Sequence, residues 1–289
     1  MTEIEESLIL EEEEEIYYNK LIEIYGEDSL TDDCRRRLVY AFRHECDQAK
    51  RMEVTCKEAK QILEWRAKFE MDTILQRTLP HSDLFQACWP SYFYGEDIDG
   101  HVITVDILQD IKVEIFQQNL THLDQLLALR AQFMERLQWE KNAISIRRGV
   151  RVTKHISLVD INGFGLKYIS PSFLSYMKPI FEIGQTYYPE TLHCMYVINV
   201  PYIFTSAWKL ISSFVSSETS QKIHLLKNKE EFLKVAESNG IGVEAIPVQF
   251  GGSHQGRKVD DSFQPSVPDT PLPIATRHST SCATETVQS

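Results

Sequence analysis

The sequence predicts an α/β domain with a mostly parallel sheet flanked by helices, preceded by a helical lobe and followed by a disordered tail. Three observations predict it. Strand-like and helical segments alternate between residues 89 and 237, as in layered α/β domains. Residues 32–78 have helical periodicity and contain neither glycine nor proline. After Gly252 large apolar side chains become scarce, so little surface is left to offset the entropy of ordering.

Four regions follow from composition. Residues 1–31 form an acidic N-terminal arm, 32–85 the helical lobe, 86–252 the α/β domain and 253–289 the disordered tail. Residues 1–33 hold thirteen acidic side chains and one basic one, which accounts for the whole net charge of −12. We expect the arm to be a solvated, partly helical extension. The alternative is that it repels anionic membranes or masks a basic surface.

The elements of the first half are set by periodicity and turn signals. In the lobe, apolar residues recur every three or four positions over 38–42 and 62–69, which indicates two to four helices. Asp99-Gly100 marks a turn, and residues 101–108 after it have strand composition. Leucines and Phe133 form one apolar face over residues 113–147, which predicts a long helix.

The second half continues the alternation. Residues 150–161 are rich in β-branched side chains, 194–200 are almost entirely apolar and 222–226 form a last short strand. Helices are expected at 170–188, interrupted near Pro179, at 201–216, where the pattern is amphipathic, and at 229–237.

Several classes of function are not expected. The neutral body lacks the basic face of a nucleic-acid binder. No G-x-S-x-G, H-E-x-x-H or P-loop motif is present, and no cysteine pair has C-x-x-C spacing, so we predict no enzyme, no metal site and no cofactor. No apolar run reaches the roughly 18 residues of a membrane span. We expect a cytoplasmic monomer with transient peripheral membrane contact.

Four stretches in the α/β region carry a resemblance. They are YFYGEDIDG at 92–100, VDING at 159–163, YYPE at 187–190 running into MYVINVP at 195–201, and TSAWKLISSFVSSETSQKI at 205–223 closed by PVQFGG at 247–252. In this order they resemble the CRAL-TRIO lipid-binding family, which includes the fungal-type phosphatidylinositol/phosphatidylcholine transfer proteins. The resemblance implies that the chain encloses one lipid as cargo, most simply phosphatidylinositol or a related phospholipid, and transfers or presents it at membranes.

The sequence departs from the family pattern at two places. Where the family often has Arg-Pro after the hairpin glycine, this chain has His101-Val102. The Arg-Lys pair of members that bind phosphatidylinositol falls on Glu45-Cys46, Gln48-Ala49 or Lys50-Arg51, depending on a short gap. Only the last of these would supply positive charge.

The resemblance implies a gate helix over the pocket at about 202–215. The apolar side chains Phe204, Trp208, Ile211 and Phe214 share one face of this segment, as a gate facing acyl chains requires. The alternative is an ordinary amphipathic helix covering a solid core.

The resemblance also implies contacts to the lipid headgroup. Thr219 and Lys222 match the family's inositol-phosphate contacts, and a helix would place them on one face. Glu190 matches the glutamate of the family's YYPE and is expected to pair with Lys50 or Arg51 of the lobe. As alternatives, Thr219 and Lys222 are surface residues and Glu190 is a carboxylate at the end of a turn or helix.

His155 and Ser157 lie on one face of the second predicted strand. They occupy positions where choline-lipid-binding members carry two small hydroxyl residues. Ser157 keeps that character, whereas an imidazole at 155 suggests altered choline-lipid binding or a structural histidine.

Two other functions stay open. Domains that resemble this one also act as lipid sensors, or as interaction modules with a vestigial pocket, in which case the terminal segments would do the work. The second alternative keeps the pocket and changes the cargo to a single-chain or isoprenoid lipid, for which Lys222 would be dispensable.

Overall fold

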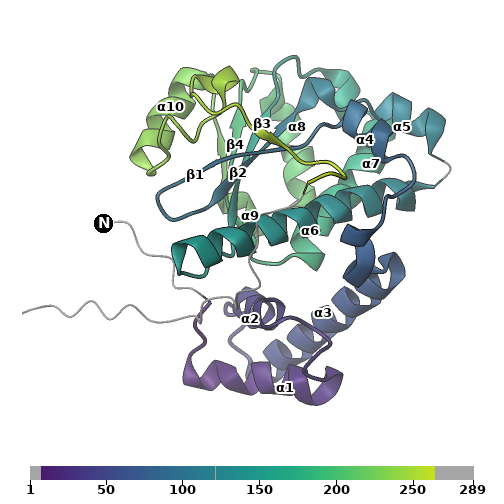
Figure 1. Ribbon diagram of the computed structural model, residues 1–289, viewed down its shortest axis with the longest axis vertical. Coiled ribbons are helices and arrows are strands. Elements are labelled where there is room, and N and C mark those ends of the chain that lie inside the picture. Colours follow the sequence, from purple (N-terminus) through teal and green to yellow (C-terminus); the bar gives the residue numbers. More distant parts are fainter. Residues whose placement is uncertain (1–7, 121, 264–289) are drawn as a thin grey trace, which may run out of the picture.

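The computed structural model describes residues 8–120 and 122–263. A helical lobe lies below a layered α/β body in Figure 1, and the long helix α6 runs across the body on the side nearer the lobe. The helices are α1 Glu15–Tyr25, α2 Asp32–Ala41, α3 Gln48–Phe69, α4 Ser82–Cys88, α5 Val113–Asn119, α6 Leu123–Arg148, α7 Pro171–Glu182, α8 Phe204–Ile211, α9 Ser217–Gln221 and α10 Lys229–Ser238. The α/β prediction is confirmed.

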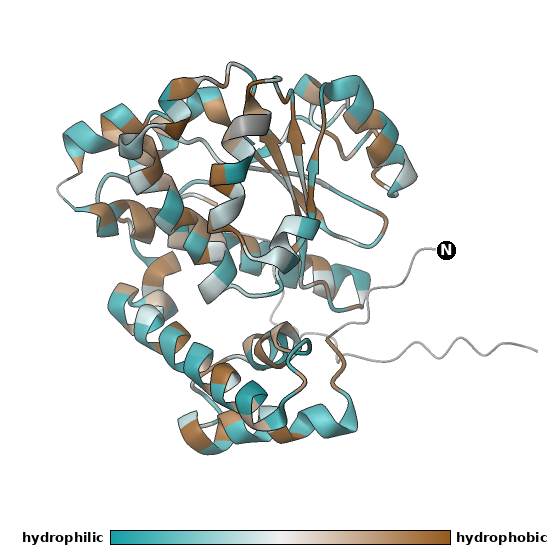
Figure 2. Ribbon diagram, turned by 180° about the vertical axis from the view of Figure 1, so that it is seen from behind, coloured by the Kyte–Doolittle hydropathy of each residue, from teal (hydrophilic) through white to brown (hydrophobic). Residues whose placement is uncertain are grey.

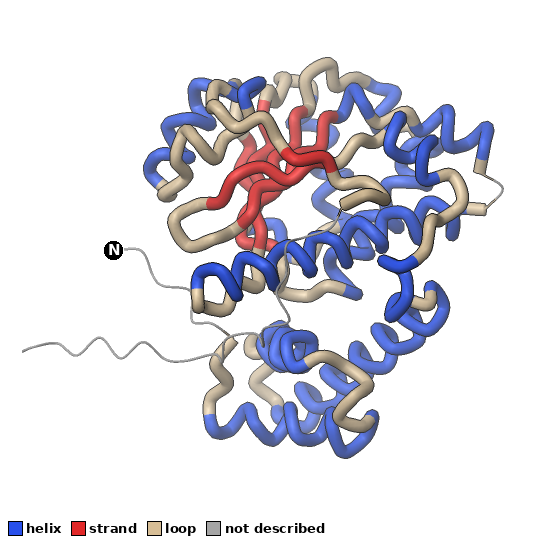
Figure 3. The backbone as a smooth tube through the Cα atoms, viewed as in Figure 1, coloured by secondary structure: helices blue, strands red, loops and turns tan. Residues whose placement is uncertain are grey.

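The sheet lies at the centre of the body (Figure 3) and has the strand order β5-β4-β3-β2-β1-β6. Its strands are β1 Tyr92–Glu96, β2 Val102–Ile107, β3 His155–Asp160, β4 Leu192–Ile198, β5 Ile223–Leu225 and β6 Arg257–Lys258. Strands β2 to β5 pair in parallel, and β1 pairs antiparallel with both β2 and β6. The sheet is therefore mostly parallel, with an antiparallel edge.

Helices cover both faces of the sheet, and the strands between them are largely hydrophobic (Figure 2). On one face Phe232 and Ala236 of α10 pack against Ile156 and Tyr196. On the other face Phe133 and Leu137 of α6 belong to the cluster that contains Val102. A parallel sheet that is buried on both sides favours apolar strands, as the sequence has.

The N-terminal lobe includes most of the predicted arm. Tyr17 and Leu21 of α1 are buried in one cluster with Leu38 of α2 and Ile62 of α3. Residues 8–31 are thus part of the packed lobe, and their prediction as a solvated extension is wrong. Residues 1–7 lie outside the described part of the chain.

Glu14 explains why an acidic segment packs there. Its side chain is buried and accepts hydrogen bonds from Arg43 at 2.6 Å and from Arg51 at 2.7 Å. Burial raises the pKa of the Glu14 carboxyl, but these bonds outweigh that effect and lower the pKa to about 2. A carboxylate held between two guanidinium groups can be buried in ionised form.

Several predicted elements are shorter than the sequence indicated. The strand predicted at 150–161 begins at His155, because Val152 and Thr153 bond to side chains of α6: the Val152 amide donates to Ser145, and Lys141 donates to the Thr153 carbonyl at 2.7 Å. The helix predicted at 113–147 is divided into α5 and α6. The helix predicted at 201–216 is α8 followed by a 3₁₀ turn at Ser212–Phe214.

The segment after Gly252 does not leave the fold at once. Residues 257–258 form β6 on the open side of β1, and Val259 and Phe263 are buried in the cluster that contains Phe93. The disordered tail was predicted to start at 253, so that boundary is wrong by at least eleven residues. Two apolar side chains, pairing with the edge of β1 and an ion pair between Asp261 and Arg136 anchor this polar segment. The remainder of the predicted tail, 264–289, lies outside the described residues.

Ion pairs and aromatic rings join the lobe to the body. Arg151 pairs with Asp33 of α2, which also accepts from Arg37 at 3.2 Å. Trp65 of α3 stacks on Tyr187 with ring centroids 4.4 Å apart. The lobe is therefore attached to the body through both ion pairs and aromatic contacts.

Candidate functional site

Helix α8 lies closed against the sheet, in the place predicted for the gate. Phe204 is buried, and Trp208 and Ile211 are half-buried against the same cluster, which includes Val197 of β4 and Ile161 after β3. Phe214 follows in the 3₁₀ turn and is half-buried beside Lys178, whose ammonium lies 5.7 Å from its ring centre. The structure therefore brings Phe204, Trp208 and Ile211 to the inner side of one segment, and Phe214 is half-buried at its end.

The outer side of this segment is also partly apolar, which the helical pattern did not emphasise. Tyr202 is 97% exposed, Ile203 47% and Leu210 43%. A surface helix that presents large apolar groups to solvent suits contact with a membrane interface.

Gln185 holds the end of the gate segment, and sequence reasoning missed it. Its amide donates to the Phe214 carbonyl at 2.9 Å, and its oxygen accepts from the Ser216 amide at 2.8 Å. Gln185 lies in a π-helical turn, Ile183–Tyr187, that follows α7. Such turns are frequent at functional sites, and the signal in the sequence was the helix interrupted by Pro179.

Glu190 and Lys222 form an ion pair at the amino ends of β4 and β5. The Lys222 ammonium donates to the Glu190 carboxylate at 3.0 Å, and both side chains are partly exposed. The sequence named both residues as headgroup contacts and the structure brings them together. The partner predicted for Glu190 is nevertheless wrong, because Lys50 pairs with Glu45 and Arg51 with Glu14.

Thr219 lies three residues before Lys222, in α9. Its hydroxyl accepts from Ser216 at 3.1 Å, and its carbonyl accepts from the Lys222 amide at 3.0 Å. The predicted helical spacing is therefore present, since Lys222 is the C-terminal cap of α9. A hydroxyl and an ammonium close together can both donate to one phosphate.

His155 and Ser157 are buried on the sheet face toward α6, and not at the surface with Lys222. Burial, reinforced by the positive charge of Lys141, lowers the pKa of His155 to about 3. Its Nδ1 atom has no hydrogen-bond partner among the described residues. His155 is therefore a neutral imidazole at the amino end of β3.

A partly buried charge on this face was missed by sequence reasoning. Arg130 of α6 lies over the rings of Trp89 and Phe133, and donates to Asp106 at 3.4 Å. One of its terminal nitrogens is buried without a described partner. The available signal was a charged residue within the apolar stripe of α6, one turn after Leu126.

A cavity of larger volume lies away from the gate segment. It is a cleft of about 300 Å³ between α3 of the lobe and α7 with its π-helical turn, lined among others by Trp65, Leu127 and Tyr187. This volume is at the lower end of the range for drug-sized ligands. Space for a two-chain lipid beneath α8 would require that helix to move.

Comparison with known proteins adds to this geometry. The family model of the CRAL/TRIO domain matches residues 87–252, more than half of the chain. The chain belongs to the CRAL/TRIO family. The matched region contains the whole gate segment, both residues of the Glu190–Lys222 pair, and His155.

Among relatives of this CRAL/TRIO chain, the Sec14 cytosolic factor of Schizosaccharomyces pombe is 28% identical over 240 residues, covering 79% of this chain and 77% of that protein. The phosphatidylinositol/phosphatidylcholine transfer protein SFH13 of Arabidopsis thaliana is 29% identical over 206 residues, covering 70% of this chain but 32% of that longer protein. The crystal structure of Sfh5 matches with a TM-score of 0.59 at 17% identity, over 88% of this chain and 95% of that one, which shows a shared fold.

Across residues 8–120 and 122–263, no helix has both the length and the apolar character needed to cross a membrane.

Proposed function

We propose that this chain binds one phosphatidylinositol or related phospholipid beneath α8 and transfers or presents it at membranes, without catalysing a reaction. The observation that carries the proposal is the closed position of α8, whose apolar side packs on the sheet while Leu210 on the helix and Tyr202 and Ile203 just before it are exposed. Such a helix suits both acyl chains and a membrane interface. The lipid is cargo, no cofactor is involved, and the protein acts in the cytoplasm as a monomer with transient membrane contact.

The cost of exposing a lipid explains the need for a gate. Each methylene buried from water contributes about 0.8 kcal/mol. A two-chain phospholipid with about thirty methylenes would therefore cost more than about 20 kcal/mol to release into water. Exchange must take place while the protein is docked on a bilayer and α8 is displaced.

Lys222 is the proposed phosphate contact. Its ammonium now donates to Glu190, and both groups are accessible to solvent. A lipid phosphate can therefore replace the carboxylate, or share the ammonium with it, at small cost in free energy. Thr219 supplies a neighbouring hydroxyl. One of the relatives, SFH13 of Arabidopsis thaliana, supports this headgroup class, because its name describes phosphatidylinositol/phosphatidylcholine transfer.

Inside the pocket, Arg130 and His155 support a polar contact beneath the headgroup. Each has a buried nitrogen without a described partner, and the charge of Arg130 is near enough to affect His155. Buried polar atoms usually find a partner, so an unpaired set is where a ligand can bind. With imidazole in place of a hydroxyl at 155, we propose that choline lipids bind less well than phosphatidylinositol.

One observation favours a second candidate function, a lipid sensor or an interaction module with a vestigial pocket. Phe204 and Ala207 already fill the space against Val197 and Ile161. If α8 does not move, the body is a solid core and the terminal segments carry the function.

Native mass spectrometry of the full-length protein, followed by identification of extracted lipid, tests the proposal. We expect one phospholipid per chain, with phosphatidylinositol enriched. A single-chain or isoprenoid lipid would contradict the headgroup role of Lys222. A protein that is empty and fails to load from mixed vesicles would overturn the transfer function in favour of the interaction module.

A further inference from the structure

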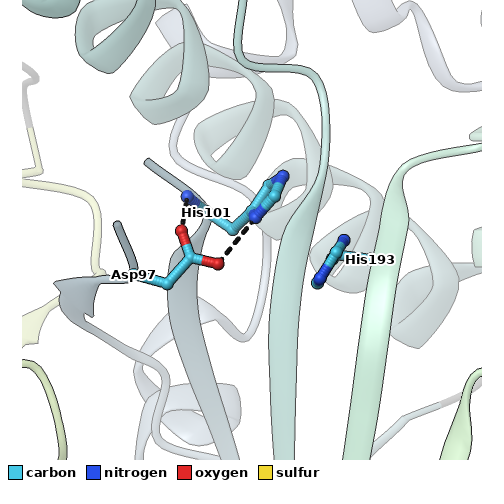
Figure 4. A group of neighbouring side chains, drawn as sticks. All are labelled: Asp97, His101 and His193. Atoms are coloured by element: carbon cyan, nitrogen blue, oxygen red, sulfur yellow. Dashed lines mark hydrogen bonds and ion pairs between the residues drawn. The ribbon is translucent and has the colours of Figure 1, made fainter. Parts of the chain in front are cut away.

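Two histidines and an aspartate, none of them a proposed lipid contact, meet at the amino ends of the parallel strands. Asp97 begins the β1–β2 hairpin turn, His101 immediately precedes β2, and His193 lies in β4 (Figure 4). One ligand atom from each lies within 4.8 Å of the other two. Within the described residues, this is the one group of three or more potential ligands of this kind.

Asp97 is held in place by the turn itself. One carboxylate oxygen accepts from the Asp99 amide at 3.0 Å and from the His101 amide at 2.8 Å. The other oxygen accepts a single side-chain contact, from His101 Nδ1 at 2.8 Å. These two amide donors keep the carboxylate in its orientation even if the second oxygen changes partner.

A β-bulge brings His193 to this place. His155 pairs with Leu192 and Ile156 pairs with Cys194, so His193 is an extra residue in β4. A bulge redirects the side chain of the inserted residue. Here the redirected imidazole stacks on His101, with ring centroids 4.2 Å apart and planes at 13°.

The residue types and their spacing fit a divalent transition metal. Imidazole nitrogens and one carboxylate oxygen are ligands that zinc and its neighbours accept at about 2.0–2.2 Å. Ligand atoms around such an ion lie about 3.4–4.2 Å apart, so separations within 4.8 Å need only small shifts. The stacked rings must turn so that their lone pairs converge, and the torsion that turns an imidazole is soft.

Access and charge are also suitable. Asp97 and His101 are buried, while His193 is half-buried and leaves a path for the ion and for water ligands. One carboxylate offsets half of the charge of a divalent cation. The anchored oxygen of Asp97 keeps its two backbone donors while the second oxygen turns to the metal.

We propose that Asp97, His101 and His193 bind one divalent first-row transition metal ion, completed by water, that ties the β1–β2 hairpin to β4 across β3. The ion has a structural or regulatory role at the amino edge of the sheet. None of its three ligands is among the residues proposed to contact the lipid, although Glu190 and Lys222 lie at the same edge of the sheet.

The test is a Co²⁺ titration of the tag-free, full-length protein after treatment with EDTA, followed by visible absorption and repeated by calorimetry with Zn²⁺. We expect saturation at one ion per chain and a higher melting temperature with Zn²⁺. The variants H193Q and D97N should each lower the affinity by more than about tenfold. Since His193 is half-buried, H193Q should fold normally, which circular dichroism checks.

The matched control is H44Q, which removes a histidine from the loop between α2 and α3 of the lobe. It should bind Co²⁺ as the unaltered chain does. Absence of saturable binding, or an H193Q affinity equal to that of the unaltered chain, would overturn the proposal. Because lipid loading is measured separately, its failure would leave this result unaffected, and the reverse is also true.

Discussion

Lys222 is the residue on which the proposed headgroup contact depends. We predict that K222Q lowers phosphatidylinositol transfer between vesicles by about tenfold or more, because a charge-assisted bond to phosphate contributes about 1.5–3 kcal/mol. The fold should be unaffected, since the partly exposed pair with Glu190 contributes at most about 1 kcal/mol. Transfer assays and thermal melts on the same preparation measure both effects.

A charge swap separates binding from structure. If Lys222 serves only to pair with Glu190, the double variant E190K/K222E restores the ion pair and should restore transfer. We expect it to restore the melting temperature of K222E but not transfer, because the ammonium is displaced from Thr219. Full recovery of transfer would contradict the phosphate contact.

His155 makes a prediction about pH. Its folded pKa of about 3 lies below the ordinary value of 6.5, so between these limits the unfolded chain binds a proton that the folded chain does not. Stability from this group is therefore present above about pH 6.5 and is lost as the pH falls towards 3. At pH 4.5 the loss is of the order of 2–3 kcal/mol.

We predict that H155Q removes this part of the acid sensitivity. Urea unfolding of both proteins at pH 7 and pH 4.5 measures it: the free energy of unfolding should fall less steeply with acid in the variant. The carboxylates contribute equally to the pH dependence of both proteins, so their effect cancels in the comparison. Parallel pH profiles would show that His155 is not buried in neutral form.

At the scale of elements, α8 is the proposed link between the lipid pocket and the membrane. Phe204 is buried, so changing it would report on packing. Leu210 is 43% exposed, and L210D should therefore report on docking alone. Loss of a partly inserted leucine is expected to weaken binding to vesicles about tenfold, since its burial contributes about 1–2 kcal/mol.

The control for this element is V243D, at an aliphatic residue that is 57% exposed after α10. It introduces the same charge outside the gate segment and should leave vesicle binding unchanged. Co-sedimentation with vesicles compares the two variants. Equal binding by L210D and the unaltered chain would place the membrane contact on another surface.

The elements themselves were largely predictable, and their ends were not. Turn signals and apolar runs located β2, β4 and β5 to within two residues of the predicted limits. The strand β3 was overestimated because its first residues bond to Ser145 and Lys141 of α6, a competition that no local pattern reveals. β6 was missed because its two residues become a strand only by pairing with β1.

At the scale of the molecule, buried charges attach the lobe to the body. Arg151 is 11% exposed and pairs with Asp33, whose second partner is Arg37. We predict that R151L lowers the free energy of unfolding by about 1–3 kcal/mol and increases hydrogen exchange in α2, because a buried carboxylate loses one of its two partners.

The matched control is R36L. Arg36 forms a more exposed pair with Asp32 on the same helix, at 3.0 Å, and its removal should cost less than about 0.5 kcal/mol. Equal effects of R36L and R151L on hydrogen exchange would show that the lobe is not held by the buried pair.

The sequence by itself determined the fold class, the family and the inward face of α8, because these depend on periodicity and on motifs that are local in the chain. Only the tertiary structure decided which partners meet. Glu190 pairs with Lys222 and not with the lobe, and Glu14 lies buried between Arg43 and Arg51. Asp97 and His101 meet His193 across β3. The physical reason is that an ion pair or a ligand set depends on distances of a few ångströms between residues far apart in the chain, which strand register and helix packing set.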